Sequence, residues 1–209
     1  MKTKQFIINE KKTISMYSQN NEEEFILNHF KEFKGTFLDL GAYDGKDLSN
    51  TRALMELGWK GICFEPNPTV FEKLAHNCME FRDVYCYEMA MGTVNGTFKL
   101  NANDTYYSTL IDSELDRWKG AFEFKEVECE VIDFETFMQT SPFKTFDFIS
   151  IDCEGIDFEI LKQIDLNKVG CKMVCVETNG KETDKYINYI KEFGFNVVTI
   201  NPENLIMAK

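Results

Sequence analysis

The chain has 209 residues and carries 23 Lys and Arg against 35 Asp and Glu, which is a formal net charge of −12 at pH 7. This acidic surplus repels phosphate backbones and anionic lipid head groups, so we expect neither a nucleic-acid partner nor a membrane surface. With 44% hydrophobic residues, the chain is long enough to bury a sizeable core in one domain.

Apolar runs and cysteines predict a cytoplasmic protein. No apolar run exceeds four residues, against the roughly 20 that a membrane-spanning helix needs, and the lysine-flanked start is too short in apolar residues for a secretion signal. The seven cysteines are an odd number without a C-x-x-C pair, and most lie in apolar runs, where reduced thiols act as small hydrophobic groups. With only two histidines, a three-histidine metal site is excluded.

Short strand-like runs alternate with longer helical runs, which is typical of an α/β domain with a mostly parallel sheet. In chain order the predicted elements are a helix over residues 20–33, a strand over 36–40, a helix over 46–57, a strand over 61–64, a helix from 68, a strand over 84–89, extended stretches over 96–100 and 126–132, a strand over 146–151, a helix over 157–165, a strand over 172–176, a helix over 182–193, and a closing hairpin over 195–200 and 205–208. No repeat or long flexible linker separates them.

Two of these helices have clear ends and faces. The first begins with an asparagine cap and three glutamates in its first turn, and we expect it to bury Ile26, Phe30 and Phe33. The helix from Pro68 has Asn67 as its N-cap and carries apolar residues at helical spacing. This predicted core stripe consists of Phe71, Leu74, Ala75 and Cys78.

The clearest local signal is FLDLGAYDG over residues 37–45, a strand that enters a tight glycine turn before a helix. Parallel α/β sheets bind their ligands at such turns. The turn lacks the G-x-G-x-x-G spacing of a dinucleotide site, and the carboxylates of Asp39 and Asp44 would repel a diphosphate. They favour a cationic ligand such as S-adenosylmethionine, whose own carboxylate can lie at the helix N-terminus.

Glu65 ends the second predicted strand, where an acid can accept hydrogen bonds from both hydroxyls of a ribose. Together with the turn at Gly41 and Gly45, it favours a ligand that contains a nucleoside. In the structural alternative, the glycines only make a turn and Glu65 caps the helix that starts at Pro68.

Five segments occur in order along the chain. They are FLDLGAYDG (37–45), CFEPNP (63–68), YEMAMGTVNG (87–96), the Ser108-Thr109-Leu110 stretch and FDFISIDCEG (146–155). Together they resemble the FkbM-type S-adenosylmethionine-dependent methyltransferases over roughly residues 35–208. The resemblance implies a class I methyltransferase fold, which is a Rossmann-like α/β architecture with a seven-stranded sheet, helices on both faces and a C-terminal antiparallel hairpin. We expect residues 1–34 to form an N-terminal arm and lead-in helix, and residues 35–209 to form the S-adenosylmethionine-binding domain.

The resemblance also implies which residues surround the cofactor, S-adenosyl-L-methionine. These are Gly41, Ala42, Gly45, Glu65, Pro66, Asn67, Met89 and Ala90. The predicted cofactor set is completed by Asp39, Tyr43, Asp44 and Asp152. The family often has an asparagine and a lysine where this chain has Tyr43 and Ser150, and loss of the lysine makes the reacting pocket more acidic.

Methyl transfer to a hydroxyl needs a group that removes the hydroxyl proton. The predicted catalytic set, Asp152, Glu154 and Glu177, follows two predicted strands. In one interpretation Asp152 or Glu154 is the general base; in another, Asp152, Glu177 and Asn179 hold a Mg²⁺ that acidifies the hydroxyl. In the structural alternative, Glu154 and Asp157 cap the next helix and Glu177 pairs with a lysine.

Residues 101–124 are predicted to form a lid over the acceptor. Tyr106, Tyr107 and Trp118 lie there among polar residues, a mixture that suits sugar rings and other flat faces. The polar residues are Asn101, Asn103, Asp104 and Ser108. Alternatively, the aromatic residues cover the sheet edge, or Arg117 and Lys119 meet an anionic substituent.

We therefore expect an S-adenosylmethionine-dependent O-methyltransferase that acts on a sugar or another polyhydroxylated small molecule, as the resemblance implies. Two alternatives from other classes are kept. An NAD-dependent oxidoreductase is disfavoured by the missing G-x-G-x-x-G motif. A catalytically silent cofactor-binding module is disfavoured by the presence of Asp152 and Glu154.

Overall fold

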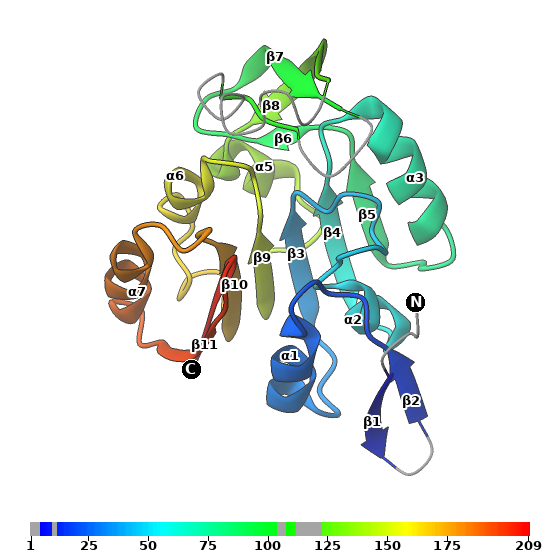
Figure 1. Cartoon of the computed structure of the whole chain (residues 1–209), viewed down its shortest axis with the longest axis vertical. Coiled ribbons are helices and arrows are strands. Elements are labelled where there is room, and N and C mark those ends of the chain that lie inside the picture. The colour runs from blue at the N-terminus through cyan, green and yellow to red at the C-terminus, as the bar shows by residue number, and fades with distance from the viewer. Residues whose placement is uncertain (1–4, 10–11, 104–107, 112–122) are drawn as a thin grey trace.

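The chain is built around a seven-stranded sheet (Figure 1). The structure, a computed structural model, describes residues 5–9, 12–103, 108–111 and 123–209. In sheet order the strands are β11 (Asn196–Ile200), β12 (Asn204–Ala208), β10 (Met173–Glu177), β9 (Phe148–Ile151), β3 (Thr36–Leu40), β4 (Lys60–Phe64) and β5 (Val84–Tyr87). Neighbouring strands from β10 to β5 are parallel, whereas β12 is antiparallel to both β10 and β11. This topology confirms the predicted fold class and its closing hairpin.

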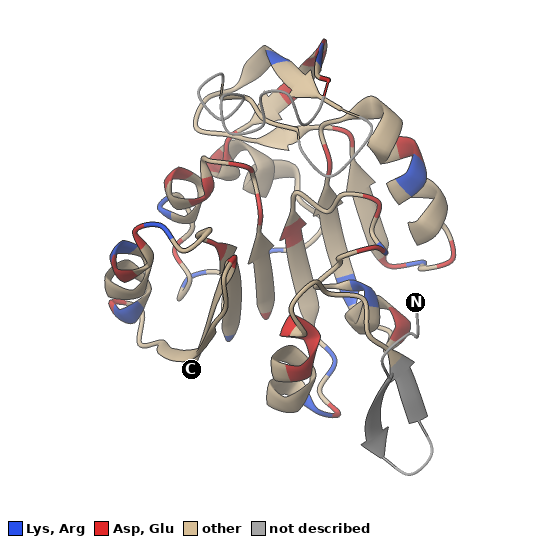
Figure 2. Ribbon diagram, in the orientation of Figure 1, with Lys and Arg blue, Asp and Glu red and all other residues tan. Residues whose placement is uncertain are grey.

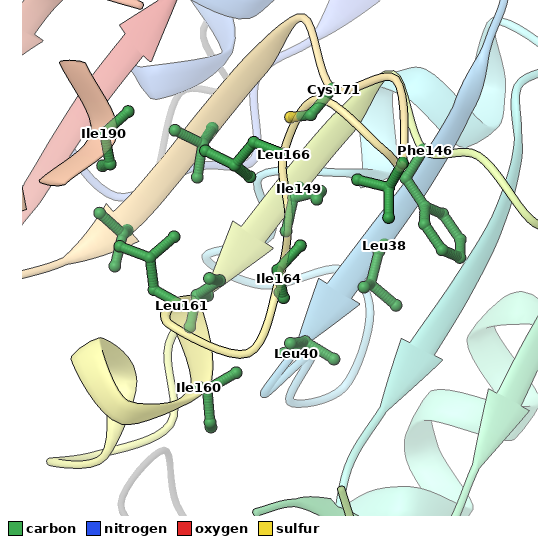
Figure 3. Packing of buried hydrophobic residues seen from close by; sticks show 14 of the residues in the cluster. Leu38, Leu40, Phe146, Ile149, Ile160, Leu161, Ile164, Leu166, Cys171 and Ile190 are labelled. Carbon is green, nitrogen blue, oxygen red and sulfur yellow. The ribbon is translucent and has the colours of Figure 1, made fainter. Parts of the chain in front are cut away.

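Helices cover both faces of the sheet, because successive side chains of each strand point to opposite sides. One face carries α1 (Glu22–Phe30), α2 (Arg52–Glu56) and α3 (Pro68–Cys78), and the other carries α5 (Phe134–Thr140), α6 (Asp157–Leu161) and α7 (Thr183–Lys191). Each face has its own hydrophobic core. In β3, Phe37 packs into the core beneath α1, α2 and α3, whereas Leu38 and Leu40 pack into the second core, beneath α5, α6 and α7. Figure 3 shows this second core, in which Leu161 and Ile190 approach the sheet from their helices.

A small second sheet lies over the carboxyl ends of the central strands (Figure 1). It consists of β6 (Ala90–Met91), β8 (Lys125–Ile132) and β7 (Gly96–Ala102), which confirms the two predicted extended stretches. At the other end of the view, β1 (Gln5–Asn9) and β2 (Lys12–Ser15) form a projecting hairpin. Within the described ranges, no helix has the length and apolar content to cross a bilayer.

The predicted helix over residues 46–57 is wrong in its first half, because α2 begins only at Arg52. Leu48 has a left-handed backbone with a φ of 61°, which interrupts any helix at that point. The hydroxyl of Ser49 then accepts hydrogen bonds from the backbone N–H groups of Thr51 and Arg52, at 3.2 and 3.0 Å. This local hydrogen bonding starts the helix six residues later than the predicted position.

Two predicted core positions are exposed. Phe33 keeps 42% of its surface exposed because α1 ends before it, and Ala75 is exposed while Val70 is buried on the same helix. The first turn of α1 also departs from the prediction. Glu22 and Glu23 are buried, and the side chain of the N-cap residue, Asn21, makes no capping hydrogen bond to the helix.

Candidate active site

A cavity of about 290 Å³ lies at the carboxyl ends of the central strands. The predicted residues in its wall are Asp39, Gly41, Ala42, Tyr43, Glu65, Pro66, Met89, Ala90, Asp152, Glu154, Glu177 and Asn179. Asp44, Gly45 and Asn67 do not line it. The structure therefore brings most of the predicted site together, and the contacts of these residues with a cofactor stay a prediction.

The glycine turn after β3 fits closely against the end of β9. Gly41 has a φ of 83°, and a Cβ added to it would lie 1.7 Å from the carbonyl oxygen of Asp152, so no other residue fits. The N–H groups of Gly41 and Ala42 both donate to the carbonyl oxygen of Phe64, at 3.1 and 2.8 Å. This turn therefore joins the ends of β3, β4 and β9 into one wall.

Glu65 lies at the end of β4 and is almost fully buried. Its carboxylate accepts the backbone N–H groups of Tyr43 and Asn67, at 3.1 and 2.9 Å, one on each oxygen. Burial raises the pKa of Glu65 to about 8, and these two hydrogen bonds partly oppose the shift. The side chain is held rigidly between the glycine turn and the start of α3.

Asp39 lies beneath the turn and is buried at the inner side of the cavity. The hydroxyl of Thr51 donates to its Oδ2 at 2.6 Å. Burial raises the pKa of Asp39 to about 7, although this hydrogen bond favours the ionised form. A cation in the cavity would offset the cost of ionising this buried acid.

Three carboxylates gather where β9 and β10 end. Their oxygens, from Asp152, Asp157 and Glu177, lie within 4.8 Å of one another. Asp157 accepts the backbone N–H groups of Cys153 and Gly155, at 2.6 and 3.1 Å. Asp157 therefore holds the turn after β9 and does not cap the next helix as the structural alternative predicts, since the N-cap of that helix is Ile156, which makes no capping side-chain hydrogen bond.

The surface of Asp152 that is exposed faces the cavity, and protein groups surround the rest of the residue. This environment raises the pKa of Asp152 well above its ordinary value, and the charges of Glu154 and Asp157 raise it further. Asn179, the third predicted Mg²⁺ ligand, also lines the cavity.

A short segment of the predicted lid closes the cavity next to the small sheet. The amide of Asn67 donates to the carbonyl oxygen of Asn103 and to Ser108, at 2.7 and 3.1 Å. The hydroxyl of Thr109 donates to the carbonyl oxygen of Glu154 at 2.9 Å. The remaining predicted lid residues, Asp104, Tyr106, Tyr107, Arg117, Trp118 and Lys119, lie outside the described residues.

The far wall contains residues that sequence analysis missed. Glu203, in the loop between β11 and β12, lines the cavity, and its carboxylate accepts a hydrogen bond from Gln19 at 2.7 Å. Its carbonyl oxygen accepts the N–H groups of Thr178 and Asn179, at 2.7 and 2.9 Å. The segment Asp47 to Asn50 also contributes, and no motif in the sequence marks any of these positions.

The described wall of the cavity is strongly acidic. Its carboxylates are those of Asp39, Asp47, Glu65, Asp152, Glu154, Glu177 and Glu203. The described lining contains no lysine, arginine or histidine. Figure 2 shows part of this acidic group at the upper end of β3 and on the loop that follows β9.

Comparisons with known proteins agree with this architecture. A precorrin-6y C5,15-methyltransferase from Geobacter metallireducens superposes with a TM-score of 0.53 and 14% identity, covering 98% of this chain and 93% of that one. A ribosomal protein L11 methylase from Lactobacillus delbrueckii subsp. bulgaricus gives a TM-score of 0.52 and 10% identity, covering 90% and 77%. At these identities the structures show the fold alone, which is that of class I methyltransferases.

Sequence comparison identifies the family more directly. No curated protein matches the chain significantly. The family model described as the methyltransferase FkbM domain matches residues 39–197, which is most of the chain and includes the glycine turn, Glu65 and the acids after β9 and β10. The chain therefore belongs to the FkbM methyltransferase domain family.

Proposed function

We propose that the chain transfers a methyl group from S-adenosyl-L-methionine to a hydroxyl of an uncharged, polyhydroxylated small molecule such as a sugar. One observation carries the proposal: a single cavity combines Glu65, beside the glycine turn, with Asp152 and Glu177 at the ends of the next two strands. Family membership supports methyl transfer, and the chemistry of the cavity wall supports the choice of cofactor and acceptor.

The cavity wall fits S-adenosylmethionine in its hydrogen-bonding groups and in its charge. A carboxylate has about four lone-pair sites, and the two N–H groups that Glu65 accepts leave sites for both ribose hydroxyls. Asp39 places negative charge near a cationic ligand. The described lining contains no lysine, arginine or histidine to pair with a diphosphate, which argues against the NAD-dependent alternative.

S-adenosylmethionine supplies a methyl group that is activated by its positively charged sulfur. The task of the chain is to orient the acceptor oxygen and to remove its proton. Asp152 suits this second task because its raised pKa favours the neutral carboxyl that remains after it takes the hydroxyl proton. Glu154 and Glu177 flank the same part of the cavity and can accept hydrogen bonds from other hydroxyls of the acceptor.

The charge of the cavity restricts the acceptor. The described lining has seven acidic residues and no lysine, arginine or histidine, so it offers no cation to pair with a phosphate, a carboxylate or a nucleotide sugar. A sugar or polyol presents only hydroxyls, which donate to carboxylates without a charge penalty. We therefore propose an acceptor without acidic groups.

The Mg²⁺ hypothesis has weaker support. Asp152 and Glu177 lie close enough to share an ion, but the third nearby carboxylate, Asp157, already accepts two backbone N–H groups. Mg²⁺ strongly prefers an octahedral shell of oxygen ligands. If the ion is required, EDTA abolishes methyl transfer and added Mg²⁺ restores it. Full activity in EDTA would leave direct proton removal by a carboxylate.

The first experiment is isothermal titration calorimetry of the full chain with S-adenosylmethionine, S-adenosylhomocysteine and NADH. We expect both adenosyl compounds to bind and NADH not to bind, and tight NADH binding alone would contradict the proposal. Neutral sugars and polyols, their phosphates, and nucleotide sugars are then incubated with methyl-labelled S-adenosylmethionine. Label in neutral acceptors supports the assignment, whereas label only in phosphorylated ones contradicts it. Cofactor binding without transfer to any acceptor would favour the silent binding module.

A further inference from the structure

A second cluster of reactive side chains lies outside the cavity, behind the glycine turn. Cys63 in β4 and Cys86 in β5 are partners in the register of these parallel strands, and Cys78 ends α3 beside them. The three Sγ atoms lie within 4.8 Å of one another. A Cβ added to Gly45 would lie 3.1 Å from the Sγ of Cys78, so the cluster adjoins the turn that forms the cavity wall.

The spacing of these sulfur atoms is close to that of a metal site. With metal–sulfur bonds of about 2.3 Å, the ligand sulfurs of a trigonal or tetrahedral site lie about 4 Å apart, so each pair here has to close by at most about 1 Å. The thioether sulfur of Met55 lies 3.9 Å from the Sγ of Cys78 and adds a fourth sulfur. Thiolate and thioether ligands select soft, thiophilic ions such as Cu⁺ and Zn²⁺.

Burial and charge are compatible with such an ion. Cys63 and Cys78 are buried, whereas Cys86 is half-buried and offers a route from solvent. Binding would release the thiol protons to solvent, and three thiolates around Zn²⁺ would leave one net negative charge. The guanidinium of Arg52 donates to the carbonyl oxygen of Asn77 at 2.8 Å, next to Cys78. Because it also pairs with Glu56 and Glu80, at 3.3 and 3.0 Å, it offsets this charge only in part.

We propose that Cys63, Cys78 and Cys86 bind one thiophilic metal ion, Cu⁺ or Zn²⁺, with Met55 as a weak fourth ligand. The three thiols come from three elements that pack together only in the folded chain, so the ion would stabilise the junction of β4, β5 and α3. This site is separate from the proposed methyl-transfer site and does not depend on it.

The test is metal binding by the full, reduced chain under anaerobic conditions, in separate titrations with Cu⁺ and Zn²⁺ against a competing chelator. We expect one equivalent of one of these ions to bind, and the two titrations decide which. The Cys86→Ser variant should lose at least about tenfold in affinity, because removing a ligand costs no less than removing a group that supports one. Cys129→Ser, which removes a buried thiol in β8, is the matched control and should bind as the original chain does.

A second measurement needs no variant. Titration of the chain with Co²⁺ should produce thiolate-to-metal charge-transfer absorption whose intensity corresponds to three thiolates, and the stronger-binding ion should abolish it. Absence of binding by both ions, or affinity that is equal in Cys86→Ser and Cys129→Ser, would show that the three thiols only pack against one another. Circular dichroism establishes that both variants are folded.

Discussion

Two groups of buried acids in this molecule have similar burial but different surroundings. Glu22 and Glu23 lie in the first turn of α1, and Asp39 and Glu65 lie at the cavity wall. Burial raises the pKa of Glu23 to about 7, the same value to which it raises the pKa of Asp39. The pKa shift alone therefore does not distinguish a structural acid from a functional one.

The partners of these acids do distinguish them. Glu22 accepts the side-chain amides of Asn201 and Asn204 at 2.7 and 2.8 Å, and Glu23 accepts the backbone N–H groups of Tyr17 and Ser18. These bonds tie the segment before α1 to its first turn and α1 to the β11–β12 loop. Glu65, by contrast, combines two backbone bonds with a position in the cavity wall. An acid that lines a cavity can bind a ligand, whereas one enclosed by protein groups can only hold the fold.

The largest expected effect is that of Asp152→Asn on turnover. The amide keeps the shape of the side chain but cannot take a proton, so we expect methyl transfer to fall at least about a hundredfold while S-adenosylmethionine still binds. In the original chain, turnover should rise with pH as Asp152, with its raised pKa, loses its proton. Initial rates across pH, with calorimetry for binding, measure both effects.

Glu154→Gln is the matched variant, because Glu154 lines the same cavity two residues further along. It should keep most of the turnover. If instead Glu154→Gln is inactive and Asp152→Asn is active, the base is Glu154, which is also an acid of the cavity wall.

The next largest effect is that of Glu65→Ala on cofactor affinity. Loss of a carboxylate that accepts both ribose hydroxyls should weaken S-adenosylmethionine binding at least about tenfold, since each charge-assisted hydrogen bond contributes about 1.5–3 kcal/mol. Hydroxyl donors favour the ionised carboxylate, so affinity in the original chain should increase as pH rises toward about 8, the pKa of Glu65. Calorimetry at several pH values measures both quantities.

Glu203→Gln serves as the control for charge, because Glu203 lines the far wall of the same cavity. It should change affinity much less and leave its pH dependence in place. Equal losses in both variants would mean that Glu65 acts only through the overall negative charge of the cavity.

The central strands of the large sheet could be predicted from the sequence because they are buried on both faces. β3 and β10 appear as short apolar runs, and the turn at Gly41 is marked by a residue that alone tolerates its backbone and its close contact with β9. Glu65 could be located because it directly follows such a strand. These features are local, so a few consecutive residues carry the information.

The cavity's far wall could not be predicted, because it depends on distant contacts. Gln19 and Glu203 meet across 184 positions of the chain, and no spacing rule links them. The start of α2 was missed for a related reason. The predicted helix includes residues 46–51, but the hydrogen bonds of Ser49 and the left-handed backbone of Leu48 keep this segment out of the helix. The glutamates in the first turn of α1 likewise predict only a favourable interaction with the helix dipole, whereas in the structure Glu22 accepts hydrogen bonds from the distant Asn201 and Asn204.

The last prediction concerns the structural acids, whose effect is on stability and not on binding or turnover. The ordinary pKa of Glu23 is 4.5, and its pKa in the folded chain is about 7. Between pH 4.5 and pH 7 the folded state therefore binds more protons than the unfolded state. The free energy of unfolding should therefore fall as pH rises from about 4.5 to 7, with no further contribution from Glu23 above that range. In Glu23→Gln the decrease over this window should be smaller by about 1–3 kcal/mol, because this group no longer titrates.

Urea unfolding at several pH values measures this change, and Glu24→Gln is the control, because Glu24 is exposed on the same turn. That control should retain the full pH dependence. Cofactor affinity should be unchanged in Glu23→Gln, because Glu23 lies outside the cavity wall. A large loss of affinity in this variant, without a loss of stability, would place the first turn of α1 in the binding machinery and remove the distinction between the two groups of acids.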